Sequence, residues 1–129
     1  MNIMNNYGSL VGRVFISALF LMAGVSKITG YASTQGYMQA MGVPEVLLPL
    51  VIVLEVLGSF AIIIGYKTKV AAFLLAGFSI ISAFVFHFNF ADQMQSVMFM
   101  KNIAIAGGFL FLVVNGPGLL SLDNKLANK

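Results

Sequence analysis

The stretch VLLPLVIVLEVLGSFAIII, residues 46–64, carries a single ionisable side chain, Glu55, near its middle. A helix of about 20 apolar residues is long enough to cross the hydrocarbon core of a membrane. A carboxylate at mid-depth costs roughly 2.5–3.5 kcal/mol on insertion, so it faces the interior of a bundle or a polar cavity and usually has a partner. The sequence therefore predicts a membrane-spanning helix in which Glu55 marks an internal polar site.

The composition of the whole chain agrees with a membrane protein. Of its 129 residues, 60% are hydrophobic and 9% are charged, whereas soluble domains carry about 25% charged residues. We therefore expect one integral membrane domain over residues 1–129. The absence of cysteine excludes disulfides, thiolate metal sites and iron–sulfur clusters, and a single histidine cannot build a metal site alone. In a membrane protein, the net charge of +3 indicates orientation and headgroup contact rather than nucleic-acid binding.

Apolar segments long enough to span the bilayer occur at residues 9–28, 46–66, 69–90 and 97–115. Short links make neighbouring helices antiparallel, so we predict an all-α membrane fold, an antiparallel four-transmembrane-helix bundle in contact with the lipid bilayer. The longest link, residues 29–45, alternates Tyr and Met with Ser, Thr and Gln. That pattern predicts a short interfacial helix between the first two spans.

The positive charges predict the orientation of the bundle. Lys67 and Lys69 lie in the turn between spans two and three, and Lys125 and Lys129 lie in the tail. Because Lys and Arg are enriched in cytoplasmic loops, we expect this turn and both termini to be cytoplasmic.

The polar residues inside the spans are predicted to converge. In the predicted orientation, Lys27, His87 and Lys101 lie toward the periplasmic ends of their spans, and Glu55 lies near mid-depth. Each shares a helical face with small residues, which mark helix–helix contacts in lipid. We therefore expect Glu55 to pair with Lys27 or Lys101, with His87 in the same network. Two alternatives stay open, because lysines near span ends can snorkel to headgroups and a buried ion pair can be purely structural.

An aromatic run follows the third span, with Phe84, Phe88 and Phe90 around His87. These rings are candidates for the wall of a pocket for a flat ligand, and lipid-facing bulk is the alternative interpretation.

Several ordered motifs resemble the DoxX family along nearly the whole chain: residues 24–28 (GVSKI), 54–55 (LE), 64–68 (IGYKT), 101–104 (KNIA) and 115–118 (NGPG). The resemblance implies a small, multi-pass bacterial inner-membrane protein with four helices. The family takes its name from a subunit of a thiosulfate–quinone oxidoreductase, and several members are linked to quinones, catechols or oxidative stress.

Three functional hypotheses follow. The first is a quinone- or phenolic-binding membrane subunit associated with an oxidoreductase or an oxidative-stress response, in which Glu55 and His87 relay protons. Its ligand would contact Lys27, Lys101, Asn102, Phe84, Phe88 and Phe90. The chain encodes no redox cofactor motif, so the candidate cofactor is a quinone and electrons would come from a soluble or membrane partner. The alternatives are a structural anchor that recruits soluble redox enzymes and a small proton-coupled transporter.

Some residues are expected to act structurally rather than chemically: Arg13, Gly24, Gly65, Gly108 and Pro117. Whether the chain is itself catalytic stays open, as does the formation of a homo-oligomer.

Overall fold

The structure is a computed structural model that describes residues 3–128. Met1, Asn2 and Lys129, which the predicted domain and tail include, lie outside the described residues. The helices, in chain order, are α1 (Ile3–Thr29), α2 (Tyr31–Ala40), the 3-10 turn η1 (Glu45–Leu47), α3 (Leu48–Ile64), α4 (Thr68–Phe86), α5 (Gln93–Asn115) and α6 (Leu122–Ala127).

Four of the described helices are long and apolar enough to cross a membrane: α1, α3 with its preceding η1, α4 and α5. No strand occurs in residues 3–128. The predicted all-α membrane class is therefore confirmed. The helix expected between the first two spans is α2.

The helix ends differ from the ends of the apolar segments because capping, not hydropathy, decides where a helix begins. The fourth long helix begins at Gln93 rather than at residue 97, since the Asp92 side chain accepts a hydrogen bond of 3.0 Å from the Met94 backbone N–H. At the other side of this turn, α4 ends at Phe86 and His87 is its C-cap. The first helix also extends further than its apolar core and starts at Ile3.

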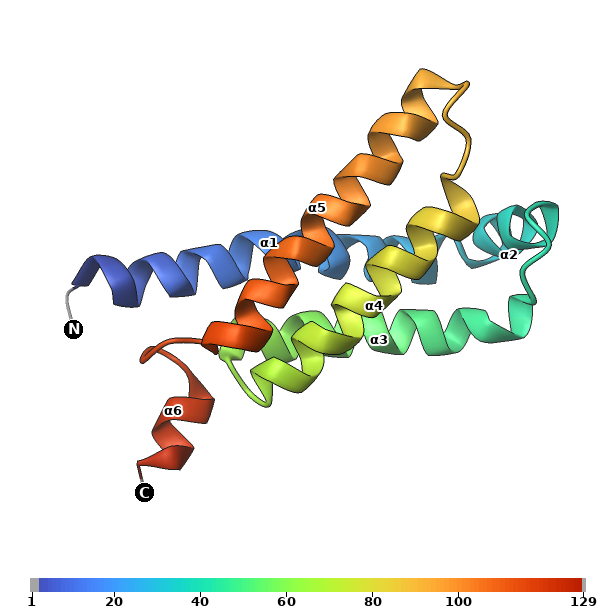
Figure 1. Cartoon of the computed structure of the whole chain (residues 1–129). Helices are drawn as coiled ribbons and strands as arrows, with labels where there is room; N and C mark the ends of the chain where they lie inside the picture. Colours follow the sequence, from blue (N-terminus) through green and yellow to red (C-terminus); the bar gives the residue numbers. More distant parts are fainter. Residues whose placement is uncertain (1–2, 129) are drawn as a thin grey trace.

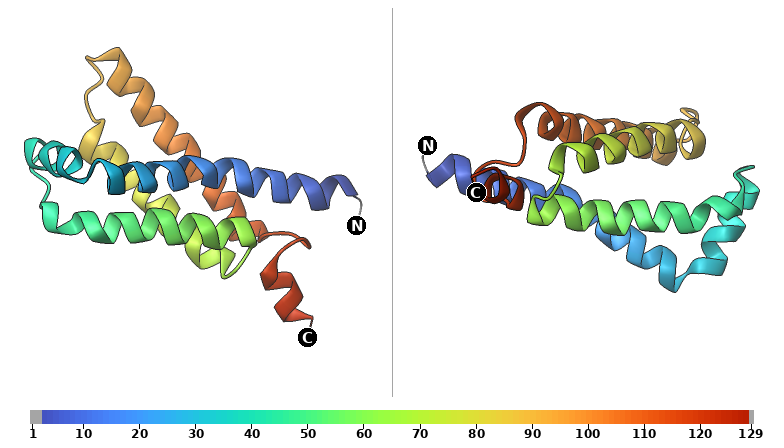
Figure 2. Two further views of the ribbon diagram at one scale, coloured as in Figure 1. Left: turned by 180° about the vertical axis from the view of Figure 1, so that it is seen from behind. Right: turned by 90° about the horizontal axis from the view of Figure 1, so that it is seen from below.

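The long helices form two antiparallel pairs that lie in two layers. One pair is α1 with α3, and the other is α4 with α5. Figure 1 shows the second pair crossing the first obliquely, and the right-hand view of Figure 2 shows the two layers edge-on. The pairs meet near the α3–α4 turn and diverge toward the α4–α5 turn, with α2 beside the diverging end (Figure 1). This divergence leaves room between the layers at one end of the molecule.

The packed core lies where the layers meet. It combines large side chains with small ones: Phe20, Ile62, Ala71, Ala72, Leu75, Ala76, Ala106 and Phe109. The rings of Phe20 and Phe109, from α1 and α5, lie 5.5 Å apart between centroids. Since lipid supplies no hydrophobic drive between helices, close approach across small residues has to hold the layers together.

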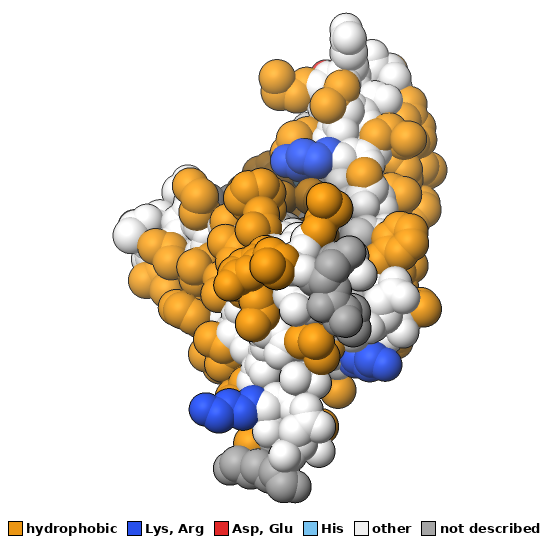
Figure 3. Space-filling model, turned by 90° about the vertical axis from the view of Figure 1, so that its left-hand side faces the viewer, with side chains coloured by type: hydrophobic (Ala, Val, Ile, Leu, Met, Phe, Trp, Pro, Cys, Tyr) orange, Lys and Arg blue, Asp and Glu red, His pale blue; other side chains and the backbone are white. Residues whose placement is uncertain are grey.

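The outer surface is apolar, as a lipid-facing surface requires. Figure 3 shows one face on which hydrophobic side chains dominate and Lys or Arg side chains are scattered. Large exposed apolar side chains occur on every long helix, for example Phe15, Leu57, Phe73 and Phe111. This exposure is expected of a chain whose solvent is the bilayer.

The segment after α5, residues 116–123, folds back onto the α3–α4 turn, and we call it the C-terminal clamp. Arg13, 1% exposed, donates hydrogen bonds of 2.9 Å to the carbonyls of both Ile62 and Ile63. It also donates to the Leu120 carbonyl of the clamp. Arg13 thereby adds donors to carbonyls in the last turn of α3, where Ile62 also accepts a hydrogen bond of 3.2 Å from the Gly65 N–H, and it joins α1, α3 and the clamp.

Asp123 attaches the clamp to the start of α4. Its carboxylate accepts hydrogen bonds from the backbone N–H groups of Lys67 (2.6 Å) and Thr68 (2.8 Å), and its own N–H donates to the Gly65 carbonyl (2.7 Å). Burial by itself would raise the pKa of Asp123, but the hydrogen bonds from Thr68 and Lys67 and the Arg13 charge outweigh it and lower this pKa. Asp123 is therefore an N-cap for α4 supplied from far along the chain.

Candidate functional site

A cavity of about 630 Å³ lies between the two helix pairs at their diverging end. This volume is within the range of sites for small molecules, roughly 300–1,000 Å³. Its walls come from α1 to α5 and the link before α3, and most of them are apolar. The polar or ionisable side chains in its lining are Lys27, Thr34, Tyr37, Glu55, Ser79, Ser82, His87, Lys101 and Asn102.

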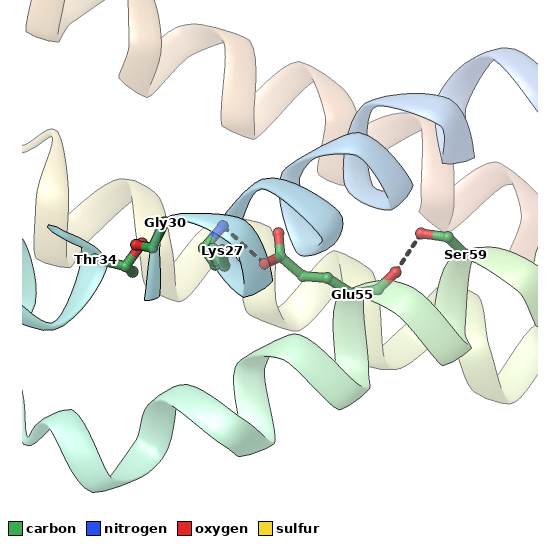
Figure 4. A network of polar contacts seen from close by, with 5 residues as sticks. All are labelled: Lys27, Gly30, Thr34, Glu55 and Ser59. Carbon is green, nitrogen blue, oxygen red and sulfur yellow. Dashed lines mark hydrogen bonds and ion pairs between the residues drawn. The ribbon is translucent and has the colours of Figure 1, made fainter. Parts of the chain in front are cut away.

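An ion pair between α1 and α3 forms one wall of this cavity. The Lys27 Nζ lies 2.8 Å from the Glu55 Oε1, and the side chains are 27% and 3% exposed, respectively. Figure 4 shows the two side chains pointing toward each other from neighbouring helices. Of the two lysines proposed from the sequence, Lys27 is the one that pairs with Glu55. The pairing offsets the cost of burying the carboxylate at this depth.

Gly24 brings the two helices close enough for this pair to form. A Cβ at Gly24 would lie 2.6 Å from the Val56 Cγ2 and 3.2 Å from the Glu55 Cβ. No real side chain fits at these distances, so a glycine is needed where α1 crosses α3.

One turn beyond Glu55, the Ser59 hydroxyl donates a hydrogen bond back to the Glu55 backbone carbonyl (Figure 4).

His87 lines the same cavity from the end of α4 but belongs to a different contact. Its Nδ1–H donates to the Gln95 Oε1 of α5 over 2.7 Å. Within the described residues, no hydrogen bond joins His87 to Glu55 or Lys27. Gln95 was not singled out from the sequence. It is a polar residue two positions before the predicted start of the fourth span at residue 97.

Lys101 and Asn102 reach the cavity from α5. Lys101 is exposed, and among residues 3–128 neither side chain has an ion pair or hydrogen bond. The two residues are consecutive on the helix, so the directions of their side chains differ by about 100° around the helix axis. The cavity thus holds an unpaired ammonium and an unpaired amide.

The aromatic residues divide into two groups. Phe84, Phe88 and Phe90 pack around Phe99, with ring centroids 5.1, 5.9 and 5.0 Å from it. These three predicted wall residues do not line the cavity. Its aromatic lining is instead Phe20, Tyr37, Phe78 and Phe86.

Tyr37 and Phe86 connect α2 to the end of α4. Their rings are stacked with centroids 5.3 Å apart and planes inclined by 21°. Tyr37 belongs to the alternating Tyr and Met pattern of the first link. That pattern did not predict that the Tyr37 ring would stack on Phe86 of α4.

The remaining predicted structural residues lie away from the cavity. A Cβ at Gly65, where φ is +75°, would collide with Ser121 at 2.4 Å, so the clamp can dock here only against a glycine. A Cβ at Gly108 would lie 2.7 Å from the Ile16 Cδ1 at the α1–α5 contact. Pro117 lies in the clamp between Gly116 and Gly118, both of positive φ. Among the described residues, no group of three His, Cys, Asp or Glu side chains could hold a metal ion.

The fold and the cavity define an integral membrane protein of four long helices with an internal, mainly apolar chamber that contains a buried ion pair. The DoxX family profile matches residues 8–88, and the chain belongs to the DoxX family.

Its relatives extend this similarity over almost the whole length. The chain is 52% identical to the inner membrane protein YqjF of Escherichia coli (strain K12), with 98% of this chain and 97% of that protein covered. It is 32% identical to the inner membrane protein YphA of the same organism, over 90% and 88% of the two chains. An uncharacterized protein of Haemophilus influenzae is 30% identical over 91% of this chain and 89% of its own. No solved structure matches the chain.

Proposed function

We propose that this protein is a ligand-binding subunit of the bacterial inner membrane, which takes a quinone or a related phenolic into the cavity between its helix pairs. The single observation that carries the proposal is the convergence of Lys27, Glu55, His87, Lys101 and Asn102 on one chamber of about 630 Å³. A purely structural ion pair would not need a ligand-sized space beside it. The names of the E. coli relatives support the inner-membrane location.

The lining suits a flat ring that carries oxygen atoms. Lys101 and Asn102 are available as hydrogen-bond donors because neither has a partner among the described residues. The stacked Tyr37 and Phe86 rings offer an aromatic surface against which a ring can pack. The apolar remainder of the chamber suits an alkyl or isoprenoid tail.

Reduction of a bound quinone to a quinol takes up two electrons and two protons. Electrons would come from a partner oxidoreductase, consistent with the oxidoreductase association of the DoxX family, because this chain encodes no redox cofactor motif. In this proposal Glu55 of α3 and His87 at the end of α4, which both line the cavity, exchange protons with the ring oxygens. The two side chains are not hydrogen-bonded to each other within residues 3–128, so the ligand or water would complete the relay.

The test is a titration of decylubiquinone against the purified protein in a neutral detergent, followed by native mass spectrometry. We expect one saturable equivalent to bind to the wild type. Ala23→Leu, which adds bulk to a cavity-lining position, should abolish binding. Ala104→Leu makes the same change at an exposed position outside the cavity and should bind like the wild type.

His87→Ala completes this test because it removes the imidazole and leaves the chamber otherwise open. We expect weaker binding by His87→Ala. If the wild type shows no saturable binding, the alternative function of a structural anchor replaces this proposal.

A further inference from the structure

We infer that, within the proposed class of quinone-related phenolics, the cavity prefers an amphipathic compound that also carries a carboxylate, whose one negative charge pairs with Lys101. This inference rests on the proposed function, in that it takes the cavity to be a ligand site. It goes beyond that function because it assigns the charge of the ligand and the residue that recognises it.

The first step is the charge of the cavity wall. Its charged side chains are Lys27, Glu55 and Lys101. The Lys27 and Glu55 charges neutralise each other across 2.8 Å. The ammonium of Lys101 therefore leaves one positive charge in excess at the chamber.

The second step is that, among the described residues, no acidic side chain other than Glu55 lines the cavity to balance Lys101. It contains four acidic residues in all, and Glu55 is already paired. Asp92 caps α5, and Asp123 caps α4 at the far end of the molecule. Glu45 accepts a hydrogen bond of 2.5 Å from the Gln39 Nε2 and does not line the cavity.

The third step is the chemistry that would satisfy this site. A carboxylate can accept hydrogen bonds from an ammonium and from an amide, and Lys101 and Asn102 supply these two donors to the cavity lining. One negative charge balances the excess, whereas a phosphate dianion would bring a second charge into a mostly apolar chamber, which is costly. The volume of about 630 Å³ accommodates an apolar body behind the head group.

The experiment compares two probes that share the octylphenyl body and differ in the head group, 4-octylbenzoate and 4-octylbenzyl alcohol, by calorimetric titration at pH 7.5 in a neutral detergent. We expect the carboxylate to bind the wild type about tenfold or more tightly, since hydrogen bonds to charged groups contribute about 1.5–3 kcal/mol. Lys101→Gln should bring the two affinities together, and Lys101→Arg should keep the preference.

Lys69→Gln is the matched control, because it removes the same charge from an exposed residue outside the cavity and should preserve the preference. Equal affinity of the wild type for the two probes would overturn the inference while leaving the cavity a ligand site. A preference that persists in Lys101→Gln would also overturn it. If neither probe binds the wild type, this inference fails, whereas the proposed function stands or falls separately by the decylubiquinone titration.

Discussion

At the scale of single residues, the partner of Glu55 is the most consequential finding. Hydropathy indicates that a mid-span carboxylate needs a counter-charge. From the sequence, Lys27 and Lys101 were both possible partners. The choice of Lys27 follows from the close crossing of α1 and α3 at Gly24. Lys101 is thereby left free to meet a ligand or the membrane surface.

The two lysines should consequently respond differently to removal. Lys27→Met leaves the Glu55 carboxylate buried without its partner, so we expect a loss of about 3–5 kcal/mol in the free energy of unfolding. Lys101→Met should change this free energy by less than about 0.5 kcal/mol, as is usual for exposed positions. The measurement is denaturant-induced unfolding in detergent, monitored by circular dichroism.

The double variant Lys27→Met with Glu55→Gln separates the pair from other effects. Because it removes both charges, it should recover most of the stability that Lys27→Met loses. Equal losses in Lys27→Met and Lys101→Met, or a double variant as unstable as the sum of its parts, would contradict the assignment of this pair.

At the scale of elements, the C-terminal clamp supplies a cap that α4 lacks locally. The residue before α4 is Lys67, which has a positive φ of 46° and no capping side chain of its own. Asp123 supplies the acceptor instead. At the end of α3, which Gly65 caps locally, Arg13 adds further hydrogen-bond donors. One tail segment and one buried side chain thus complete two helix ends at the same turn.

We predict that the contribution of Asp123 to stability depends on pH. Its folded-state pKa is lowered, so the contribution is full above the ordinary aspartate pKa of about 3.9 and is lost as pH falls through the folded value. At pH 7, Asp123→Ala should cost about 1 kcal/mol, the usual worth of an N-cap.

Thermal unfolding of the wild type and Asp123→Ala, recorded from pH 7 to pH 3, checks this prediction. The difference between them should shrink at the acidic end. Glu45→Gln is the control, because it removes a carboxylate that caps no helix, and its difference from the wild type should stay small throughout. A constant difference for Asp123→Ala would show that its carboxylate charge is not what stabilises the turn.

At the scale of the whole molecule, the two ends differ in charge and in packing. Lys67 and Lys69 at the α3–α4 turn and Lys125 of α6 lie at the end of the molecule that holds the start of α1 and the clamp, where the elements can be followed in Figure 1. Arg13 contacts the end of α3 and the clamp at this same end. The other end holds α2, the cavity and the α4–α5 turn. The clamp thus joins the helix pairs at one end, which we call the closed end, whereas the pairs diverge around the cavity at the other, which we call the open end.

We predict that the closed end is cytoplasmic, because its short turn and tail hold the greater share of positive charge. A C-terminal fusion to green fluorescent protein should fluoresce in the cell, and the same fusion to alkaline phosphatase should be inactive. A third fusion, with the phosphatase placed after residue 91 in the α4–α5 turn, should be active as the internal control. An active C-terminal phosphatase fusion would reverse the orientation and put the open cavity on the cytoplasmic side.

Amino-acid sequence alone determined the membrane class, the number of spans and the presence of an internal polar site around Glu55. These properties follow from local transfer free energies, which add up along a segment whatever its neighbours are. Tertiary structure alone decided that Lys27 is the partner of Glu55 and that Tyr37 and Phe86, not Phe84, Phe88 and Phe90, line the cavity. It also decided that Asp123 caps α4. Those outcomes depend on how closely and at what angle helices cross, which periodicity within one helix does not encode.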